Sequence, residues 1–271
     1  MFGVLERDRR PMPSDDECEP GHLESQRDRF ESQSSDYSRH HLSSVAQEYR
    51  SRFIRNSLFP NEMKGLRVLD AMCGGGEETG AMIAVGAQVE GLDLASEFAR
   101  QYTERWNRPC RVGNIAATGY ESDSFDLVYV CGGFHHVRPQ LTEVVDEIHR
   151  ILRVGGHLIL VEPNRDSWLD LFRRIWYRFD RRFTAEEAAI SVESDLLPLF
   201  EDKFVVEHIH QGGSLAYLLT AQSFILRFPQ RLISCYAPLL FWIEERLQGT
   251  VFDPRLFVCG RFHKVESGVS T

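Results

Sequence analysis

The sequence has no long apolar run and no closely spaced cysteine pair. The apolar segment APLLFWI, at 237–243, is too short to cross a bilayer, and residues 1–21 lack the apolar core of a signal peptide. The six cysteines are scattered without a CxxC pair, which indicates free thiols rather than a zinc site or a disulfide scaffold. We therefore expect a cytoplasmic protein with no bound metal.

The sequence also lacks an excess of positive charge. It has 31 lysines and arginines against 40 acidic residues, which gives a formal net charge of −9. A general nucleic-acid-binding protein is normally basic, so we expect no nucleic-acid partner. With 42% hydrophobic and 26% charged residues, the 271-residue chain has the composition of a globular protein and the length for one large α/β domain.

The N-terminal part divides into two segments. Residues 1–28 are polar and turn-prone, which predicts a disordered tail. In 29–62, Leu42, Val45, Tyr49 and Phe53 recur at helical spacing, and a proline follows this run. We expect 29–62 to form an N-terminal helical cap.

From residue 66 onward, short apolar strands alternate with helical segments. The pattern predicts strands at 66–71, 87–93, 110–114, 124–133 and 157–163, and helices at 77–86, 96–106 and 140–156. Such an alternation is typical of βαβ units in a doubly wound, mostly parallel α/β sheet. After 163 we expect edge strands of the same sheet at 202–211 and 255–264, with a helical insertion at 214–248 between them.

A glycine-rich turn follows the first predicted strand, in VLDAMCGGGEETG at 68–80. A dinucleotide fingerprint would need a third glycine where Thr79 stands, after Gly74 and Gly76. A phosphate-binding P-loop would need a Gly-Lys-Ser/Thr that is absent from the turn. The turn predicts a close approach to a ligand without a phosphate, although a plain strand-to-helix turn would also explain it.

Two aspartates narrow the choice of ligand. Asp70 ends the first strand, where a carboxylate would repel a phosphate but suit an ammonium group. Asp93 ends the second strand, where a carboxylate can accept hydrogen bonds from a ribose diol. S-adenosylmethionine has an ammonium group, a ribose and a sulfonium but no phosphate. The pair therefore favours this ligand, although Asp93 alone could also be a helix N-cap.

The ordered segments VLDAMCGGGEETG, VEGLDLASEFA, SFDLVYVCGGFHHV and EIHRILRVGGHLILVEP resemble consecutive motifs of class I S-adenosylmethionine-dependent methyltransferases. They are most similar to the small-molecule branch that includes quinone-biosynthesis enzymes (methyltransferase type 11). The resemblance implies a Rossmann-like, seven-stranded domain over 63–265, with a cofactor-binding core at 66–163. It also implies that Tyr37, on the cap, closes over the cofactor.

The same resemblance implies positions for the cofactor-binding residues. The methionine end would lie at Asp70, Met72, Gly74 and Gly76, the ribose at Asp93 and Leu94, the adenine at Asn114 and Ile115, and the pocket wall at Cys131 and Gly132. Four residues depart from the family pattern. Gly75 is usually a larger residue, Val154 replaces the usual proline before Gly-Gly, and the other two lie at the implied cofactor site. Met72 replaces a usual glycine, so a positive φ there would be strained, and Asn114 replaces a common aspartate.

Two histidines follow the fourth predicted strand. His135 and His136 lie at the sheet edge where α/β proteins bind ligands, so either is a candidate general base. An alcohol or phenol acceptor would need such a base and a carboxylate would not; the histidines could also simply form the pocket wall. Glu162 ends the fifth strand, where we favour a structural role. With Tyr37, His41 could close the pocket from the cap.

The acceptor-side segments, about 166–200 and 214–248, carry the clues to the substrate. The predicted helix at 167–182 combines an aromatic face with five arginines. It could cover an amphiphilic, lipid- or glycan-linked acceptor, make a peripheral membrane contact, or pack on the core. The apolar helix at 232–247 could shape the pocket, pack, or form a homodimer. We expect O-methylation of a small molecule; the alternatives are C-methylation of a quinone-like ring and non-catalytic cofactor binding as a sensor or scaffold.

Overall fold

The computed structural model describes residues 27–28, 31, 40–169, 189–222 and 230–266. The predicted tail therefore lies outside the described residues, apart from 27 and 28. Tyr37 and most of the predicted basic helix at 167–182 also lie outside them.

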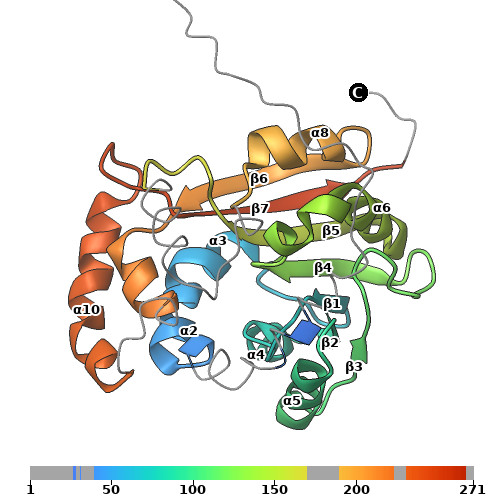
Figure 1. Cartoon of the computed structure of the whole chain (residues 1–271), viewed down its shortest axis with the longest axis horizontal. Helices are drawn as coiled ribbons and strands as arrows, with labels where there is room; N and C mark the ends of the chain where they lie inside the picture. The colour runs from blue at the N-terminus through green and yellow to red at the C-terminus, as the bar shows by residue number, and fades with distance from the viewer. Residues whose placement is uncertain (1–26, 29–30, 32–39, 170–188, 223–229, 267–271) are drawn as a thin grey trace, which may run out of the picture.

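A seven-stranded sheet runs through the centre of the molecule (Figure 1), in the order β3-β2-β1-β4-β5-β7-β6. Strands β1 to β5 pair in parallel, and β7 is antiparallel to both of its neighbours. This arrangement confirms the predicted α/β, Rossmann-like, mostly parallel sheet, and it places β6 and β7 in the same sheet as the core. The strands are β1 (Arg67–Ala71), β2 (Gln88–Asp93), β3 (Cys110–Val112), β4 (Phe125–Cys131), β5 (Leu152–Pro163), β6 (Phe204–Gly212) and β7 (Phe257–Lys264).

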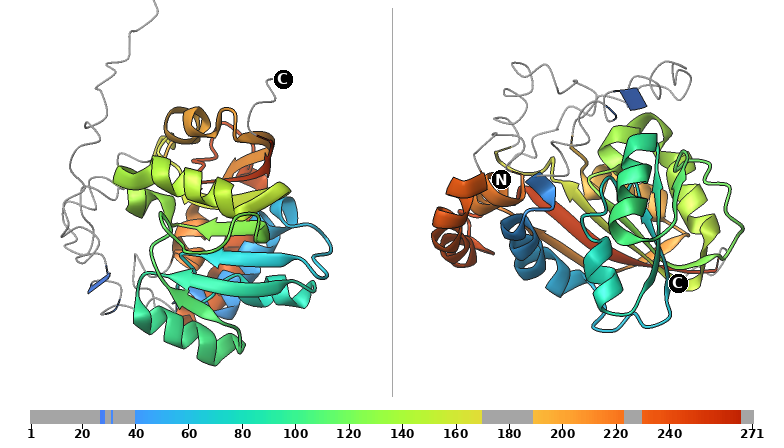
Figure 2. Two further views of the ribbon diagram at one scale, coloured as in Figure 1. Left: turned by 90° about the vertical axis from the view of Figure 1, so that its right-hand side faces the viewer. Right: turned by 90° about the horizontal axis from the view of Figure 1, so that it is seen from below.

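Helices cover both faces of the sheet (Figure 2). One face packs against α6, η3 and α8, and the other against α2, η1, α3, η4 and α10. None of the helices in the described ranges has the length and hydropathy that a membrane span requires. The helices are α2 (Ser44–Arg50), η1 (Ser51–Arg55), α3 (Asn56–Leu58), α4 (Thr79–Ala84), α5 (Ser96–Trp106), η2 (Phe134–Gln140), α6 (Leu141–Ile151), η3 (Val192–Leu196), α8 (Leu197–Phe200), η4 (Tyr217–Ala221) and α10 (Gln230–Leu247).

Two hydrophobic cores lie on the two faces. On one face, α6 buries Val144 and Ile148 against the strands. On the other, Tyr49 and Phe53 of the N-terminal helices pack against Phe241 of α10, with ring centroids 5.9 and 5.8 Å from that phenylalanine. The predicted N-terminal helical segment therefore lies between the sheet and α10 and packs against both.

The predicted helix at 140–156 is shorter in the structure. α6 ends at Ile151, and β5 begins at Leu152, which pairs with Phe125 ahead of an irregularity in the register. Gly155 has a φ of +78°, which a continuing right-handed helix cannot accommodate. The sequence pattern therefore predicted a helix that was too long at its C-terminal end, because the backbone is already a β-strand from Leu152 onward.

Candidate functional site

The turn after β1 carries backbone strain at Met72. This residue has a φ of 54°, in the left-handed region that costs a non-glycine residue about 1–2 kcal/mol. The strain that the sequence predicted for a positive φ here is therefore present. Gly133 makes room for the side chain, because a Cβ on Gly133 would lie 2.6 Å from the Met72 sulfur.

Gly76 serves the packing of the same turn. Its φ is +80°, and a Cβ there would lie 2.3 Å from Nε1 of Trp106, at the end of α5. That indole Nε1 donates a hydrogen bond to the carbonyl oxygen of Gly75, 3.1 Å away. Trp106 therefore packs against the outer side of the turn and is hydrogen-bonded to it. Gly76 contacts this indole and is not among the residues that line the pocket.

Asp93 joins the ends of β1 and β2. Its Oδ2 accepts the backbone N–H of Gly74 and its Oδ1 accepts that of Ala95, each at 2.9 Å. Burial raises the pKa of Asp93 to about 6, although the bonds from Ala95 and Gly74 oppose this shift. Each carboxylate oxygen still has a lone pair, so Asp93 can accept further hydrogen bonds from a ligand in the pocket.

Asp70 lies behind the turn. It is buried, and its Oδ2 accepts a hydrogen bond from the Thr79 hydroxyl at 2.5 Å, which ties the end of β1 to the first residue of α4. Burial raises its pKa well above the ordinary value, an effect that the Thr79 bond only partly offsets. Asp70 is not among the residues that line the pocket, so its role toward an ammonium group stays a prediction.

A pocket opens at the carboxyl ends of β1, β2 and β4. Its empty volume, including the open mouth, is about 720 Å³. Nine of its lining residues are predicted site residues: Met72, Gly74, Asp93, Leu94, Asn114, Ile115, Cys131, Gly132 and His136. The structure thus brings together residues from four separate segments of the sequence.

Four further lining residues escaped the sequence analysis: Leu92, Phe98, Gly113 and Val137. Leu92 and Gly113 directly precede the predicted site residues Asp93 and Asn114, so their position in the sequence could have identified them as pocket residues. Phe98 lies in the first turn of α5 and is 3% exposed, as an ordinary core residue would be. No sequence pattern separates such a pocket wall from core packing.

Asn114 has one side-chain oxygen lone pair already engaged. Its Oδ1 accepts the backbone N–H of Ala116 at 2.9 Å, and its Nδ2 lies 3.5 Å from the side-chain oxygen of Gln140. The second lone pair on Oδ1 can still accept a hydrogen bond, as the predicted contact with an adenine amino group requires.

Glu162 organises the segment after β4. Its Oε1 accepts the backbone N–H groups of Gly133 and Phe134, at 2.9 and 2.8 Å, and its Oε2 lies 2.9 Å from Nδ1 of His135. The carboxylate is fully buried, so these bonds replace its hydration. This geometry supports the structural role favoured for Glu162 and adds a specific function, the orientation of an imidazole.

The two histidines lie against each other. The ring centroids of His135 and His136 are 3.9 Å apart and tilted by 39°. His136 lines the pocket, whereas His135 lies one step back, where a Cβ on pocket-lining Gly132 would be 3.8 Å from its Cε1. The structure therefore places both candidate bases beside the pocket.

A buried charge cluster missed by the sequence analysis adjoins the pocket wall. Arg50 contacts Glu78 Oε1 at 3.1 Å and the Cys131 sulfur at 3.3 Å, and Arg55 contacts the other oxygen of Glu78 at 2.9 Å. His41 lies 3.3 Å from Arg50; burial, together with the charge of Arg50, lowers its pKa well below the ordinary value. His41 is therefore a neutral buried partner in this cluster.

Comparisons with known proteins agree with this geometry. A family model described as a methyltransferase domain matches residues 69–160. An uncharacterized methyltransferase of Synechocystis is 32% identical over 157 residues, which are 56% of this chain and 73% of that protein.

Two further relatives are named for quinone metabolism. A demethylmenaquinone methyltransferase of Staphylococcus epidermidis is 32% identical over 123 residues, covering 43% of this chain and 50% of that protein. A ubiquinone biosynthesis O-methyltransferase of Xanthomonas oryzae is 34% identical over 112 residues, covering 38% and 46%. The chain thus spans about half the length of these two relatives.

The fold is shared with solved methyltransferases. A geranyl diphosphate C-methyltransferase of Streptomyces coelicolor superposes with a TM-score of 0.56 at 16% identity, covering 92% of this chain and 99% of that one. In the present structure, the pocket offers a buried carboxylate with free lone pairs at Asp93, as a ribose requires, and glycine backbone beside it. The chain belongs to the class I S-adenosylmethionine-dependent methyltransferases, and S-adenosylmethionine is its methyl donor.

Proposed function

We propose that this methyltransferase methylates the hydroxyl of a small, apolar or amphiphilic acceptor. The observation that carries the proposal is the Glu162–His135 pair at the pocket, with 2.9 Å between Oε2 and Nδ1. S-adenosylmethionine supplies a methyl group on a positive sulfonium, so the protein must align the acceptor and remove its proton.

The pair can fix the protonation of His135. A carboxylate oxygen can only accept, so Nδ1 of His135 carries the proton that it donates to Glu162. The lone pair then lies on Nε2, which can accept the proton of an acceptor hydroxyl. Glu162 is thus a positioning residue, and His135 is the proposed base. His136, which lines the pocket, would contact the acceptor or the cofactor.

The names of the relatives support both a first and a second choice of reaction. The Xanthomonas protein is named an O-methyltransferase of ubiquinone biosynthesis, in line with a hydroxyl acceptor. The Staphylococcus protein is named for demethylmenaquinone, which makes C-methylation of a quinone-like ring the second candidate. A ring hydroxyl deprotonated by His135 would serve either reaction, because the phenolate is the stronger nucleophile at both oxygen and carbon.

The test is a labelled-methyl assay. The full chain is incubated with methyl-labelled S-adenosylmethionine and cell extracts separated into lipid and aqueous fractions, and the labelled product is examined by NMR. We expect label in the lipid fraction as a methoxy group. A label on ring carbon would select the second candidate, and a label confined to polar products would contradict the apolar acceptor.

Variants of the two histidines separate their roles. We expect His135→Ala to lower kcat more than it changes KM, because a base acts in the chemical step rather than in acceptor binding. His136→Ala should raise the KM or the cofactor Kd, because this residue lines the pocket. Equal kcat in His135→Ala and the unchanged protein would contradict the role of base.

An exposed apolar stripe on α10 supports the predicted homodimer. Leu232, Leu239 and Trp242 are 56%, 61% and 53% exposed and lie on one side of the helix, opposite buried Ile233 and Phe241. Isolated exposed apolar residues are common, but a stripe of them favours a contact surface. We propose self-association through this stripe. Sedimentation of the unchanged protein and of Leu239→Glu/Trp242→Glu tests it: only the unchanged protein should sediment as a dimer.

A further inference from the structure

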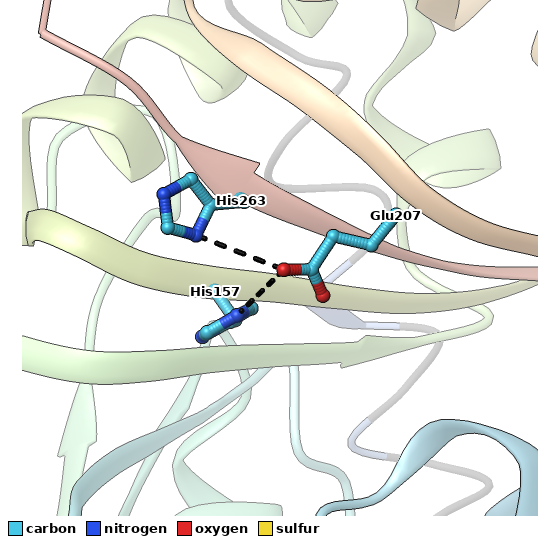
Figure 3. Close-up of side chains that lie close together, drawn as sticks. All are labelled: His157, Glu207 and His263. Atoms are coloured by element: carbon cyan, nitrogen blue, oxygen red, sulfur yellow. Dashed lines mark hydrogen bonds and ion pairs between the residues drawn. The ribbon is translucent and has the colours of Figure 1, made fainter.

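Two imidazoles and a carboxylate meet on the antiparallel side of the sheet (Figure 3). His157 Nε2 lies 3.2 Å from Glu207 Oε1, and His263 Nδ1 lies 3.8 Å from the same oxygen. All three of these atoms lie within 4.8 Å of one another, and the two rings meet edge to face. We call these residues the β-sheet triad.

The register of three strands creates the triad. His157 of β5 lies directly opposite His263 of β7, so both side chains are on the same face of the sheet. β6 has an irregularity between Val206 and His208, and Glu207 is the extra residue there. Such a bulge re-aims a side chain, and here it turns Glu207 toward the two histidines. The sheet backbone therefore holds the three groups together.

Arg261 fixes the carboxylate of Glu207. Its Nε donates to Glu207 Oε2 at 2.6 Å, and its Nη1 donates to the carbonyl oxygen of Leu58 at 3.3 Å. Arg261 thereby occupies one carboxylate oxygen and leaves Oε1 facing both imidazoles. Outer partners of this kind are what orient the ligands of metal sites in proteins.

The triad is separate from the cofactor pocket. His157 is opposite Leu127 in the β4–β5 pair, whereas the pocket begins at Cys131, four residues further along β4. At about 3.3 Å per residue this corresponds to about 13 Å along the sheet. The triad therefore has no part in the methyl transfer site described above.

We propose that the β-sheet triad binds one divalent transition-metal ion, through Nε2 of His157, Nδ1 of His263 and Oε1 of Glu207. Two imidazoles and one carboxylate are a ligand set that suits Zn²⁺, with water completing the coordination. Tetrahedral zinc needs ligand atoms about 3.4 Å apart, given bonds of about 2.0–2.1 Å. Side-chain rotation can close the remaining gap, because the His157 and His263 side chains are 32% and 38% exposed.

The ion would connect β5, β7 and β6, and so it would stabilise the edge of the sheet. The expectation of no metal rested on cysteine spacing, and these three ligands are distant in sequence and contain no cysteine. A metal that binds the folded chain raises its melting temperature by mass action. The triad thus predicts a metal-dependent stability that is independent of the cofactor.

The test uses the full chain, with any affinity tag removed and the protein dialysed against a chelator. We expect native mass spectrometry to show one Zn²⁺ per chain, and we expect Zn²⁺ to raise the Tm. With Co²⁺ in place of Zn²⁺, the absorption spectrum should show visible d–d bands. His157→Gln and Glu207→Gln should each weaken Zn²⁺ binding by about 100-fold or more, and Arg261→Gln by about 10–100-fold.

His210→Gln is the matched control, because His210 lies on the same strand β6 but outside the triad. It should bind Zn²⁺ as the unchanged protein does. Far-UV circular dichroism and S-adenosylmethionine binding check that each variant is folded. The absence of Zn²⁺ binding, or equal Zn²⁺ binding by folded His157→Gln/Glu207→Gln, would overturn the proposal and leave the triad as an ion-pair cluster.

Discussion

The Oδ2 atom of Asp93 lies 2.9 Å from the backbone nitrogen of Gly74, so the end of β2 holds the turn that follows β1. The same carboxylate lines the pocket. A residue proposed to bind the ribose therefore also shapes the loop on which the rest of the cofactor would lie.

Substitution of Asp93 should remove both functions at once. We expect Asp93→Ala to weaken S-adenosylmethionine binding by about 100-fold or more, since two hydrogen bonds to a charged group contribute about 1.5–3 kcal/mol each. Isothermal titration with S-adenosylmethionine and S-adenosylhomocysteine measures the change. Asp146→Asn is the control, because that carboxylate is 56% exposed on α6 and pairs with Lys203. Unchanged affinity in Asp93→Ala would show that the ribose lies elsewhere.

The stability of the cofactor-free protein should depend on pH through Asp93. Burial raises its pKa from 3.8 to about 6, so the folded state holds this proton more tightly than the unfolded state does. The resulting stabilisation is complete below about pH 4 and is lost as the pH rises through about 6, with a size of about 3 kcal/mol. Burial raises the pKa of Glu77 to about 7, which extends the same trend.

Urea unfolding between pH 4 and 8 measures this dependence. The free energy of unfolding attributable to Asp93 is the difference between the unchanged protein and Asp93→Asn, which does not titrate. We expect that difference to shrink as the pH rises through 6. A difference that is constant across the range would show that the pKa of Asp93 is ordinary.

Gly76→Ala should destabilise the protein more than Gly65→Ala does. Gly65 has a φ of +79°, close to the +80° of Gly76, but a Cβ there would meet no atom within 4 Å. Gly65→Ala should therefore cost only the backbone term, about 1–2 kcal/mol. Gly76→Ala adds the collision with Trp106, for a total of about 2–4 kcal/mol. Trp106→Ala should recover part of this in the double variant, measured by chemical denaturation.

Two substitutions of Glu162 should differ in their effect on stability. Glu162→Ala leaves the buried N–H groups of Gly133 and Phe134 without an acceptor, at about 1–3 kcal/mol each. Glu162→Gln keeps the oxygen for both, so stability should be nearly unchanged. Its amide nitrogen then faces Nδ1 of His135 and should move the proton to Nε2. Nitrogen-15 NMR reads the tautomer; an Nδ1–H form in a folded Glu162→Gln would contradict the orienting role.

The buried pair of Arg50 and Glu78 gives a separate prediction on stability. Their side chains are 5% and 1% exposed, so Glu78→Gln leaves the Arg50 charge buried beside fewer acceptors, at about 3–5 kcal/mol. When Arg50 is already replaced by Met, Glu78→Gln should lower the free energy of unfolding much less than it does in the unchanged protein. Chemical denaturation of the four proteins gives the coupling energy. Additive effects would show that the two side chains do not interact.

Local patterns predicted the parts of the site that lie within single motifs. Helical spacing indicated 96–106, and α5 spans Ser96–Trp106. Asp93 and Asn114 lie in the pocket because strand ends in a parallel sheet share one edge. The pairing of Arg50 with Glu78 depends instead on how the N-terminal helix packs over the turn. The direction in which the Glu207 side chain points depends on a β-bulge. Neither the docking nor the bulge leaves a periodic signal in the sequence.

The position of β7 between β5 and β6 also sets an order of events during synthesis. β6 precedes β7 in the chain, yet among the strands that the structure describes it pairs with β7 alone. A ribosome-bound chain that ends before residue 257 can thus assemble β1 to β5 around the pocket, while β6 has no strand to join. We expect the parallel part to acquire protection from proteases first, and the antiparallel edge only after the last strand has emerged.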